Sequence, residues 1–331
     1  MNLNPLHDLL SPVNLRSCLI SRRGELVYEQ YRRPQTARET AKINSCTKSI
    51  LSSLLCIAMD RGLLPEPHTP ASDFFPKLAH SEDSRKRSLT LGHLLTMTAG
   101  FEWTEFGGPN SFPHMTRTSN WIDYVLEHPL ADEPGTKMVY NSGVSQMLST
   151  ILAQAAGMPV AEFAEKNLFG PLDITSYEWE TDPQGVHTGG FGLKLRPSDM
   201  LKFGQLFLQE GRWKDRQLLS PELVKKSVTP YITVNEPWRG HYSWHWWADT
   251  FEEQTEQDTE PALSFDYFYA RGFGGQFIHI IPSMEMVVVL THDNRKNSKY
   301  PDVFRSYIAP LLLEQPGSSA LKPAAPVNRI S

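Results

Sequence analysis

The stretch NSCTKSILSSLLCIAMDRG, residues 44–62, begins with polar residues, continues into a dense apolar run and ends in a glycine. The leucines of the run predict a buried helix over Ile50–Met59. Gly62, just past the run, is the residue type that most often terminates a helix. The polar start therefore lies at the amino end of a buried helix, beside the core of the protein.

Ser45 and Lys48 form a candidate nucleophile and base at this amino end. A serine hydroxyl is a poor nucleophile until a base removes its proton. Residues three apart share one face of a helix, so the amine of Lys48 can reach the hydroxyl of Ser45. The apolar run buries the amine, and desolvation lowers the pKa of a lysine from its usual value of ~10.4. A helix N-terminus also offers a backbone N–H to an oxyanion.

The Ser-x-x-Lys spacing also occurs by chance, so a purely structural interpretation of Ser45 stays open on this motif alone. A second copy of the spacing, Ser319–Lys322, lies in a low-complexity tail with no buried helix after it. We interpret that copy as a chance occurrence. Other features of the chain must decide the role of Ser45.

The composition excludes several classes of protein. With 331 residues, of which 40% are hydrophobic, the chain is long enough for one large domain or two joined ones. A net charge of -5 gives no basic footprint for nucleic acid, and no apolar run approaches the ~20 residues that cross a membrane. Three cysteines are too few for a disulfide framework. Met1–Leu15 shows no export signal, so we expect a cytoplasmic protein.

Elements on both sides of the Ser45 helix predict a mixed fold. Leu19–Tyr31 alternates apolar and polar residues about Arg23-Gly24, which is typical of a β-hairpin. Further helices are expected at Leu89–Met97, Val144–Ala156, Pro197–Leu208 and Asp302–Leu313. Strands are expected at Tyr242–Ala248, Gln276–Ile281 and Met286–Thr291, the last two joined through a Pro282-Ser283 turn. The Gly- and Pro-rich stretch Phe106–Pro113 is expected to be a loop.

Strands near both termini with helices between them predict an α/β (α+β) fold. We expect one antiparallel sheet built from both chain ends and flanked by helices, with a mainly helical inserted domain. The α/β domain would comprise residues 1–62 and 190–314, and the helical domain residues 63–189. The tail 315–331, rich in Pro, Ala and Ser, is expected to be disordered.

From Ser45 onward, several short motifs occur in a fixed order. They are Leu89–Gly100 (LTLGHLLTMTAG), Pro134–Thr136, Tyr140–Gly143, Pro171–Ile174, Gly189-Gly190, Arg196–Met200 and Gly272–Gln276. Together with Ser45 and Lys48 they resemble the serine beta-lactamase and penicillin-binding-protein-like family. The resemblance is to the class C beta-lactamase-related esterases and the amidases similar to 6-aminohexanoate-dimer hydrolase. It implies a beta-lactamase/transpeptidase-like fold and a covalent acyl-enzyme.

The second motif of this family implies roles for Tyr140 and Ser142. Tyr140 would work with Lys48 in moving the proton of Ser45 toward the leaving group, since a phenol near a cation ionises more easily. A core tyrosine after a turn is the structural alternative. Ser142 would hydrogen-bond Lys48 or the substrate. The order Asn141-Ser142 departs from the Tyr-x-Asn of class C beta-lactamases, and a serine cannot present an amide.

The third motif departs further, because no Lys-Thr-Gly occurs and Tyr269–Phe273 is the nearest stretch. By resemblance to amide hydrolases with a Gly-x-x-Gly-Gln pattern, we expect the N–H of Phe273 to be the second oxyanion donor. The glycines at Gly272 and Gly274 would allow a close approach to the substrate. A glycine bulge that only shapes the sheet is the alternative. Loss of the motif lysine removes a cation that would hold a beta-lactam carboxylate, which counts against antibiotic hydrolysis.

Aromatic residues are abundant enough to line a substrate pocket, with Trp244 as the candidate contact, or they belong to the ordinary core. His241 and His245 are four residues apart in a strand-like stretch without a third ligand, so we predict core or pocket-wall histidines and no metal site. Cys46 lacks an activating partner and is interpreted as packing.

The sequence therefore predicts a serine hydrolase that needs no cofactor and acts through a Ser45 acyl-enzyme resolved by water. The substrate would be a carboxylic ester or a small amide, with no nucleic-acid or membrane partner. Two alternatives stay open. One is a beta-lactamase or D-alanyl-D-alanine carboxypeptidase whose leader is missing, and the other is a non-catalytic ligand-binding protein of the same fold. The natural substrate and the oligomeric state are not determined.

Overall fold

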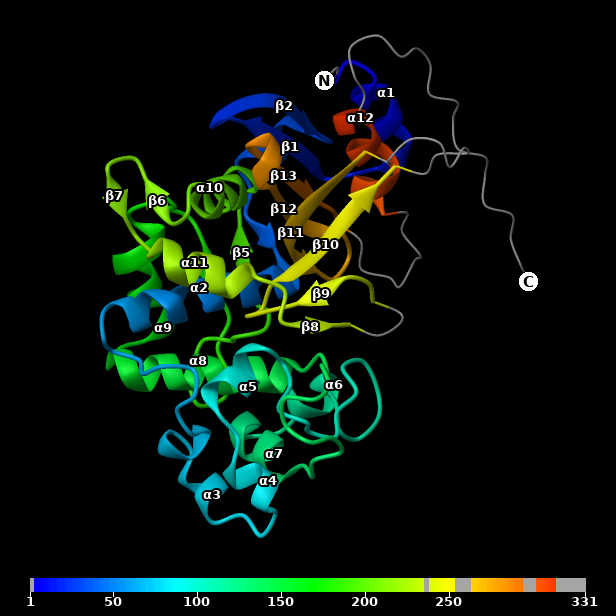
Figure 1. The fold of residues 1–331 in the computed structure, drawn as a ribbon. Coiled ribbons are helices and arrows are strands. Elements are labelled where there is room, and N and C mark those ends of the chain that lie inside the picture. Colours follow the sequence, from blue (N-terminus) through cyan, green and yellow to red (C-terminus); the bar gives the residue numbers. More distant parts are fainter. Residues whose placement is uncertain (1–2, 235–237, 254–262, 294–301, 314–331) are drawn as a thin grey trace, which may run out of the picture.

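The computed structural model describes residues 3–234, 238–253, 263–293 and 302–313, and its centre is an eight-stranded sheet (Figure 1). The strand order is β2-β1-β13-β12-β11-β10-β9-β8, and neighbouring strands are antiparallel. The strands are β1 (Ser17–Arg22), β2 (Glu25–Tyr31), β8 (Ile232–Thr233), β9 (His241–Tyr242), β10 (Trp247–Glu252), β11 (Ser264–Gly272), β12 (Gln276–Ile281) and β13 (Met286–Thr291). The first two come from the amino end and the others from the carboxyl end, as the sequence predicts.

Two small sheets accompany the large one. Their strands are β3 (Ala41–Lys42), β5 (Leu193–Leu195) and β4 (Glu178–Trp179) in one, and β6 (Arg212–Trp213) and β7 (Arg216–Gln217) in the other.

Most of the helices fall between the two groups of strands. They are α1 (Leu6–Leu10), α2 (Thr47–Asp60), α3 (Pro76–Ala79), α4 (Ser84–Arg87), α5 (Leu91–Leu95), α6 (Phe112–Met115), α7 (Trp121–Glu127), α8 (Ser142–Ala156), α9 (Val160–Ala164), α10 (Pro197–Leu208), α11 (Pro221–Val228) and α12 (Ala309–Leu313). Short 3₁₀ turns lie at Ser11–Val13, Pro34–Ala37, Asn44–Cys46, Ala71–Asp73 and Pro282–Met284, and π-helical turns at Glu165–Phe169 and Phe304–Ile308.

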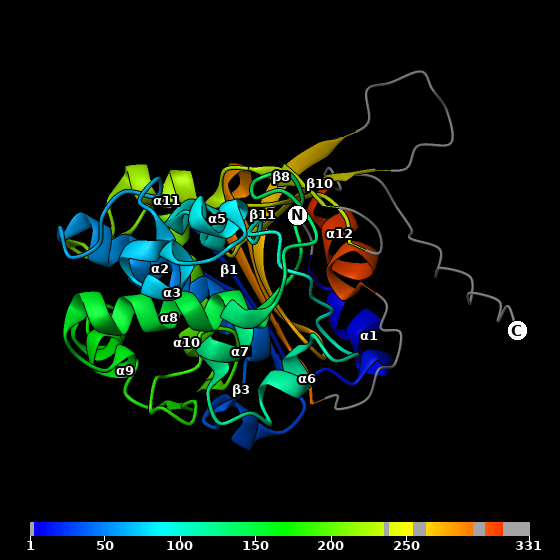
Figure 2. The same ribbon diagram turned by 90° about the horizontal axis from the view of Figure 1, so that it is seen from below.

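The large sheet is covered on both faces, with α1 and α12 on one side and α2 and α10 on the other (Figure 2). This explains why every residue of β13 is buried. Successive side chains of a strand point to opposite faces. Accordingly, Val287 and Val289 join the core of α2 and α10, whereas Val288 and Leu290 join the core of α1 and α12.

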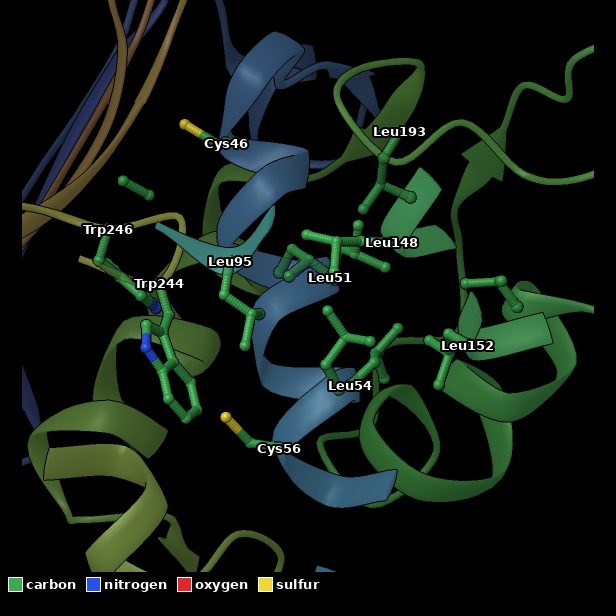
Figure 3. Packing of buried hydrophobic residues seen from close by; sticks show 14 of the residues in the cluster. Cys46, Leu51, Leu54, Cys56, Leu95, Leu148, Leu152, Leu193, Trp244 and Trp246 are labelled. Carbon is green, nitrogen blue, oxygen red and sulfur yellow. The ribbon is translucent and has the colours of Figure 1, made fainter. Parts of the chain in front are cut away.

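α10 lies against β12 and β13 at short range because Gly204 has no side chain. A methyl group there would lie 2.5 Å from Cγ1 of Val287 and 2.9 Å from Cγ2 of Ile278. On the far side of α2, Leu51 and Leu54 face Leu148 and Leu152 of α8 (Figure 3). α2 is therefore enclosed by protein along its length, as a buried helix requires.

Local patterns predict most of these elements. The hairpin about Arg23-Gly24, the buried helix, the helices at α8 and α10, and the strands β12 and β13 are confirmed. The helix predicted at Leu89–Met97 is shorter, because the side chain of Thr90 accepts a hydrogen bond from the backbone N–H of His93 and caps α5. The predicted loop Phe106–Pro113 ends in the first two residues of α6, and the last helix begins with a π-helical turn.

The continuous strand predicted at Tyr242–Ala248 is wrong. Residues 243–246 form a tight turn in which the N–H of Ser243 donates to the carbonyl of Trp246, and this turn separates β9 from β10. His245 has a left-handed backbone with φ 59°. Both its N–H and its ring bond the carbonyl of Leu95, and these long-range contacts override the local apolar pattern.

The division into residues 1–62 plus 190–314 and 63–189 stays a prediction. The predicted disordered tail and the second Ser-x-x-Lys copy, Ser319–Lys322, lie outside the described residues. Within the described ranges, no helix combines the length and the apolarity that crossing a membrane requires.

Candidate active site

The fold brings Ser45 and Lys48 together at the amino end of α2. Ser45 lies in the 3₁₀ turn Asn44–Cys46 that leads into the helix, and it is partly exposed. Nζ of Lys48 lies 3.3 Å from Oγ of Ser45. The Lys48 side chain is buried, with 1% of the residue exposed. A buried amine thus contacts an accessible hydroxyl, which is the arrangement that nucleophile activation needs.

Three oxygen atoms surround the amine of Lys48. Nζ also lies 2.9 Å from Oγ of Ser142 and 2.9 Å from the carbonyl oxygen of Gly190. An ammonium group has three N–H donors, so each donor has an acceptor. Burial nevertheless lowers the pKa of Lys48 to about 8, although the charge of Glu105 acts in the opposite direction. Near neutral pH the amine can therefore both lose and regain a proton.

Ser142 is the first residue of α8, and its neighbour Asn141 caps that helix. Oδ1 of Asn141 accepts hydrogen bonds from the N–H groups of Gly143 and Val144. The departure from the Tyr-x-Asn order thus has a local cause, because asparagine is a favoured N-cap residue. Ser142 occupies the next position, where its hydroxyl points to Lys48.

Tyr140 lies against the same amine, with its ring centroid 4.7 Å from Nζ of Lys48. Burial, followed by the charge of Glu105, raises the pKa of Tyr140. A hydrogen bond with Ser45 and the charge of Arg271 oppose this rise without cancelling it. A neighbouring cation is expected to make this phenol easy to ionise, but burial has the larger effect and makes ionisation harder. Lys48, whose pKa is lowered, is the better base of the two.

Gly272, the last residue of β11, lies against the backbone of the Ser45 turn. A methyl group at Gly272 would contact the carbonyl oxygen of Ile43 and would lie 3.2 Å from the backbone nitrogen of Ser45. The turn that follows contains Phe273 and Gly274, the latter with φ 78°. The carbonyl of Phe273 accepts a hydrogen bond from the side chain of Asn44. Phe273 therefore lies beside the Ser45 turn, on the side where Gly272 approaches it.

Trp244 does not join this group. Its indole lies beside Cys56, near the carboxyl end of α2 (Figure 3). It lines a pocket of about 650 Å³ together with residues of α5 and α11, among them Lys226. None of Ser45, Lys48 and Tyr140 is among the described residues that line this pocket. Trp103 lies nearer to the site, because its Nε1 donates to Glu105 at 2.8 Å.

His245 is a buried structural residue, and His241 is exposed. Burial lowers the pKa of His245 to about 3, so the ring is neutral. Its Nδ1 lies 2.9 Å from the carbonyl of Leu95 and its Nε2 lies 3.0 Å from Oγ of Ser145, which ties the β9–β10 turn to α5 and α8. No cluster of three potential metal ligands occurs among the residues that the structure describes.

Two further residues join the site that sequence reasoning did not assign to it. Gly190 supplies a carbonyl oxygen to Lys48, although the sequence marked it only as a motif glycine. Glu105 binds both the hydroxyl and the N–H of Ser142. It is one acidic residue beside a predicted loop, and it lies 37 positions before its partner. No local signal could have revealed this contact.

Comparison with known proteins agrees with the fold. A structure from Bacillus anthracis described as a 6-aminohexanoate-dimer hydrolase covers 90% of this chain and 78% of its own, with a TM-score of 0.72 and 21% identity. The octameric penicillin-binding protein homologue from Pyrococcus abyssi covers 95% of this chain and 77% of its own, with a TM-score of 0.71 and 20% identity.

The sequence itself is similar to the D-alanyl-D-alanine-carboxypeptidase/endopeptidase AmpH of Escherichia coli strain K12, at 24% identity over 197 residues. That match covers 53% of this chain, and the chain spans half the length of this relative. The family model described as Beta-lactamase matches residues 17–310, which is most of the chain. The chain therefore belongs to the Beta-lactamase family and has its serine-hydrolase fold.

Proposed function

We propose that this protein hydrolyses a carboxylic ester or a small amide through a Ser45 acyl-enzyme. The observation that carries the proposal is the contact of 3.3 Å between Nζ of Lys48 and Oγ of Ser45, with the amine buried and its pKa lowered to about 8. A lysine in this state can accept the serine proton near neutral pH.

The proposed reaction has two halves. Oγ of Ser45 bonds to the substrate carbonyl carbon while its proton moves to Nζ of Lys48, and the N–H groups of Ser45 and Phe273 bind the oxyanion. The bond to the alcohol or amine then breaks, and the leaving atom takes a proton through Tyr140, which Lys48 reprotonates. A water molecule next attacks the acyl-serine by the reverse path, which releases the carboxylic acid and restores the Ser45 hydroxyl.

Exposed aromatic side chains beside the site support an apolar group in the substrate. Phe106 and Phe273 are 62% and 42% exposed, and their ring centroids lie 6.0 Å apart. Phe106 follows Glu105, and Phe273 follows Gly272 at the Ser45 turn. The structural likeness to the protein described as a 6-aminohexanoate-dimer hydrolase agrees with a linear amide as one class of substrate.

Arg271 favours a second candidate, an amide or lactam that carries a carboxylate. Its guanidinium lies 4.6 Å from the ring centroid of Trp238, and that ring packs 5.9 Å from Tyr140. The charge of Arg271 acts on Tyr140, where it opposes the rise in the pKa of the phenol, so it would also attract an anionic substrate group bound at the site. The region therefore has a cation, Arg271, although the lysine of the Lys-Thr-Gly motif is absent.

One experiment tests the acyl-enzyme and then separates the substrates. Intact-mass analysis after treatment with a fluorophosphonate is expected to show one adduct on the wild type and none on Ser45→Ala. A p-nitrophenyl ester, a linear amide of aminohexanoate and a chromogenic cephalosporin are then compared. Fast turnover of the cephalosporin alone would replace the ester and amide assignment. A wild-type protein that neither labels nor turns over any of the three is a ligand-binding protein.

A cytoplasmic location is part of this proposal. Cys18, Cys46 and Cys56 are all buried and free, which is the usual state of cysteines in a reducing compartment. Cell fractionation followed by immunoblotting tests the location.

A further inference from the structure

Glu105 makes a set of contacts that the reaction above does not use. One carboxylate oxygen accepts the hydroxyl proton of Ser142, and the other accepts from the N–H of Ser142 at 3.0 Å and from Nε1 of Trp103 at 2.8 Å. The carboxylate also lies at the N-terminus of α8, a helix of 15 residues, where a negative charge is favoured. Three donors fix the group in one orientation.

These contacts determine the direction of the hydrogen bonds at Lys48. A carboxylate only accepts, so the single proton of the Ser142 hydroxyl is donated to Glu105. The same oxygen must therefore accept from Nζ of Lys48, which lies 2.9 Å away. The result is a chain in which the amine donates to the hydroxyl and the hydroxyl donates to the carboxylate.

The negative charge of Glu105 and this series of hydrogen bonds both favour the protonated form of Lys48. It raises the pKa of Lys48 and so opposes burial, which is the larger effect. Among the described residues, the other titratable or charged groups near the amine are the Cys46 thiol and the Tyr140 phenol, with His245 and Arg271 beyond them. Burial raises the pKa of both Cys46 and Tyr140 and lowers that of His245, so all three are uncharged near neutral pH. Glu105 is thus the anion that acts on the amine.

We propose that Glu105 is a positioning residue that acts on Lys48 through the Ser142 hydroxyl and sets the pH at which Ser45 becomes reactive. It takes no proton during the reaction. When Lys48 accepts the proton of Ser45, the new ammonium donates to Ser142, and the charge that forms is balanced by Glu105. The inference rests on the proposed function, because it assigns Lys48 as the base.

Glu105→Gln removes the charge and changes the hydrogen bonds. The amide can donate to Oγ of Ser142, so the hydroxyl proton of Ser142 is free to turn toward the neutral amine of Lys48. Both effects favour the neutral amine. We therefore expect the pH midpoint of fluorophosphonate labelling to move from about 8 to lower pH, by about one unit. Glu105→Asp keeps the charge and is expected to hold the midpoint near that of the wild type, with a lower maximal rate.

Glu102→Gln is the matched control, because Glu102 is an exposed acid of the same segment and has no contact with Ser142 or Lys48 among the described residues. It is expected to leave the midpoint unchanged. An unchanged or higher midpoint in Glu105→Gln overturns the inference, and so does an equal shift in the control.

A titration of Lys48 by NMR, with ¹³Cε-labelled lysine and assignment by Lys48→Met, gives a readout independent of activity. Suppose that the wild type never labels but the titration midpoint of the Lys48 resonance is still lower in Glu105→Gln. The proposed function then fails, and the coupling between Glu105 and Lys48 stands. If labelling occurs but the resonance titrates identically in both proteins, the coupling fails alone.

Thermal melting of each variant identifies any that does not fold. If Glu105→Gln does not fold, Ser142→Ala carries the NMR comparison, because it removes the hydroxyl that joins the carboxylate to the amine and is expected to move the titration midpoint of Lys48 to lower pH. An unchanged midpoint in that variant overturns the inference.

Discussion

The two ends of α2 differ in character. At the amino end, every donor of the buried Lys48 amine has an oxygen acceptor, and the accessible Ser45 hydroxyl is one of them. At the carboxyl end, Trp244 lines a pocket of about 650 Å³ whose described lining includes neither Ser45 nor Lys48. The comparison shows that this pocket and the Ser45–Lys48 contact lie in different places, because a pocket depends on gaps in packing and the contact on a few placed atoms.

Lys48→Ala should cause the largest loss of reactivity at Ser45. A small loss would contradict the difference between the two ends of α2. Without the base, Ser45 keeps its proton, and we expect labelling by a fluorophosphonate to slow about a thousandfold. Lys226→Ala is the matched change at the other end of α2, where Nζ lies 5.4 Å from the Trp244 ring centroid. That variant should label at the wild-type rate, and equal losses in both would show that the two ends are not distinct.

Tyr140→Phe should reduce turnover of a p-nitrophenyl ester about a hundredfold, because the ring and its packing remain while the proton carrier is lost. Its circular dichroism and melting temperature are expected to match those of the wild type. Tyr242→Phe is the control, since the Tyr242 hydroxyl is buried without a partner among the described residues. Removal of such a group costs little, so this second variant should keep full activity. Full activity in Tyr140→Phe would remove the phenol from the proton path.

Gly190→Ala should slow labelling about tenfold. Its methyl group would lie 2.9 Å from Nζ of Lys48 and 3.1 Å from Oγ of Ser142, so we expect the amine to shift from its position beside Ser45. An amine displaced by a fraction of an ångström loses part of its alignment. Gly107→Ala, where no atom lies within 4 Å of the added methyl, should leave the rate unchanged. A wild-type rate in Gly190→Ala would mean that Lys48 tolerates displacement.

Trp244→Ala should have the smallest effect on activity, with esterase rates within about twofold of the wild type. The side chain is 5% exposed, so its removal should instead lower the free energy of unfolding by about 3 kcal/mol, measured with urea. A higher KM with unchanged stability would return Trp244 to the substrate site, which is one of the two roles that the sequence leaves open.

The sequence predicts those parts of the molecule whose signals are local. The apolar run after Lys48 predicts α2, and the alternation about Arg23-Gly24 predicts the first hairpin. The turn at Ser243–Trp246 could not be predicted in this way, because its geometry depends on bonds from His245 to Leu95 and Ser145. Those partners are about 150 and 100 positions away.

The amino-acid sequence by itself predicted the contact between Ser45 and Lys48, because the two are three residues apart and one helical turn brings them onto one face. It also determined the family, through motifs in a fixed order. Only the tertiary structure decided what surrounds the amine. The Gly190 carbonyl, the Ser142 hydroxyl and the Glu105 carboxylate come from three separate segments. Their effect on Lys48 depends on distance and burial in space, which spacing along the chain does not encode.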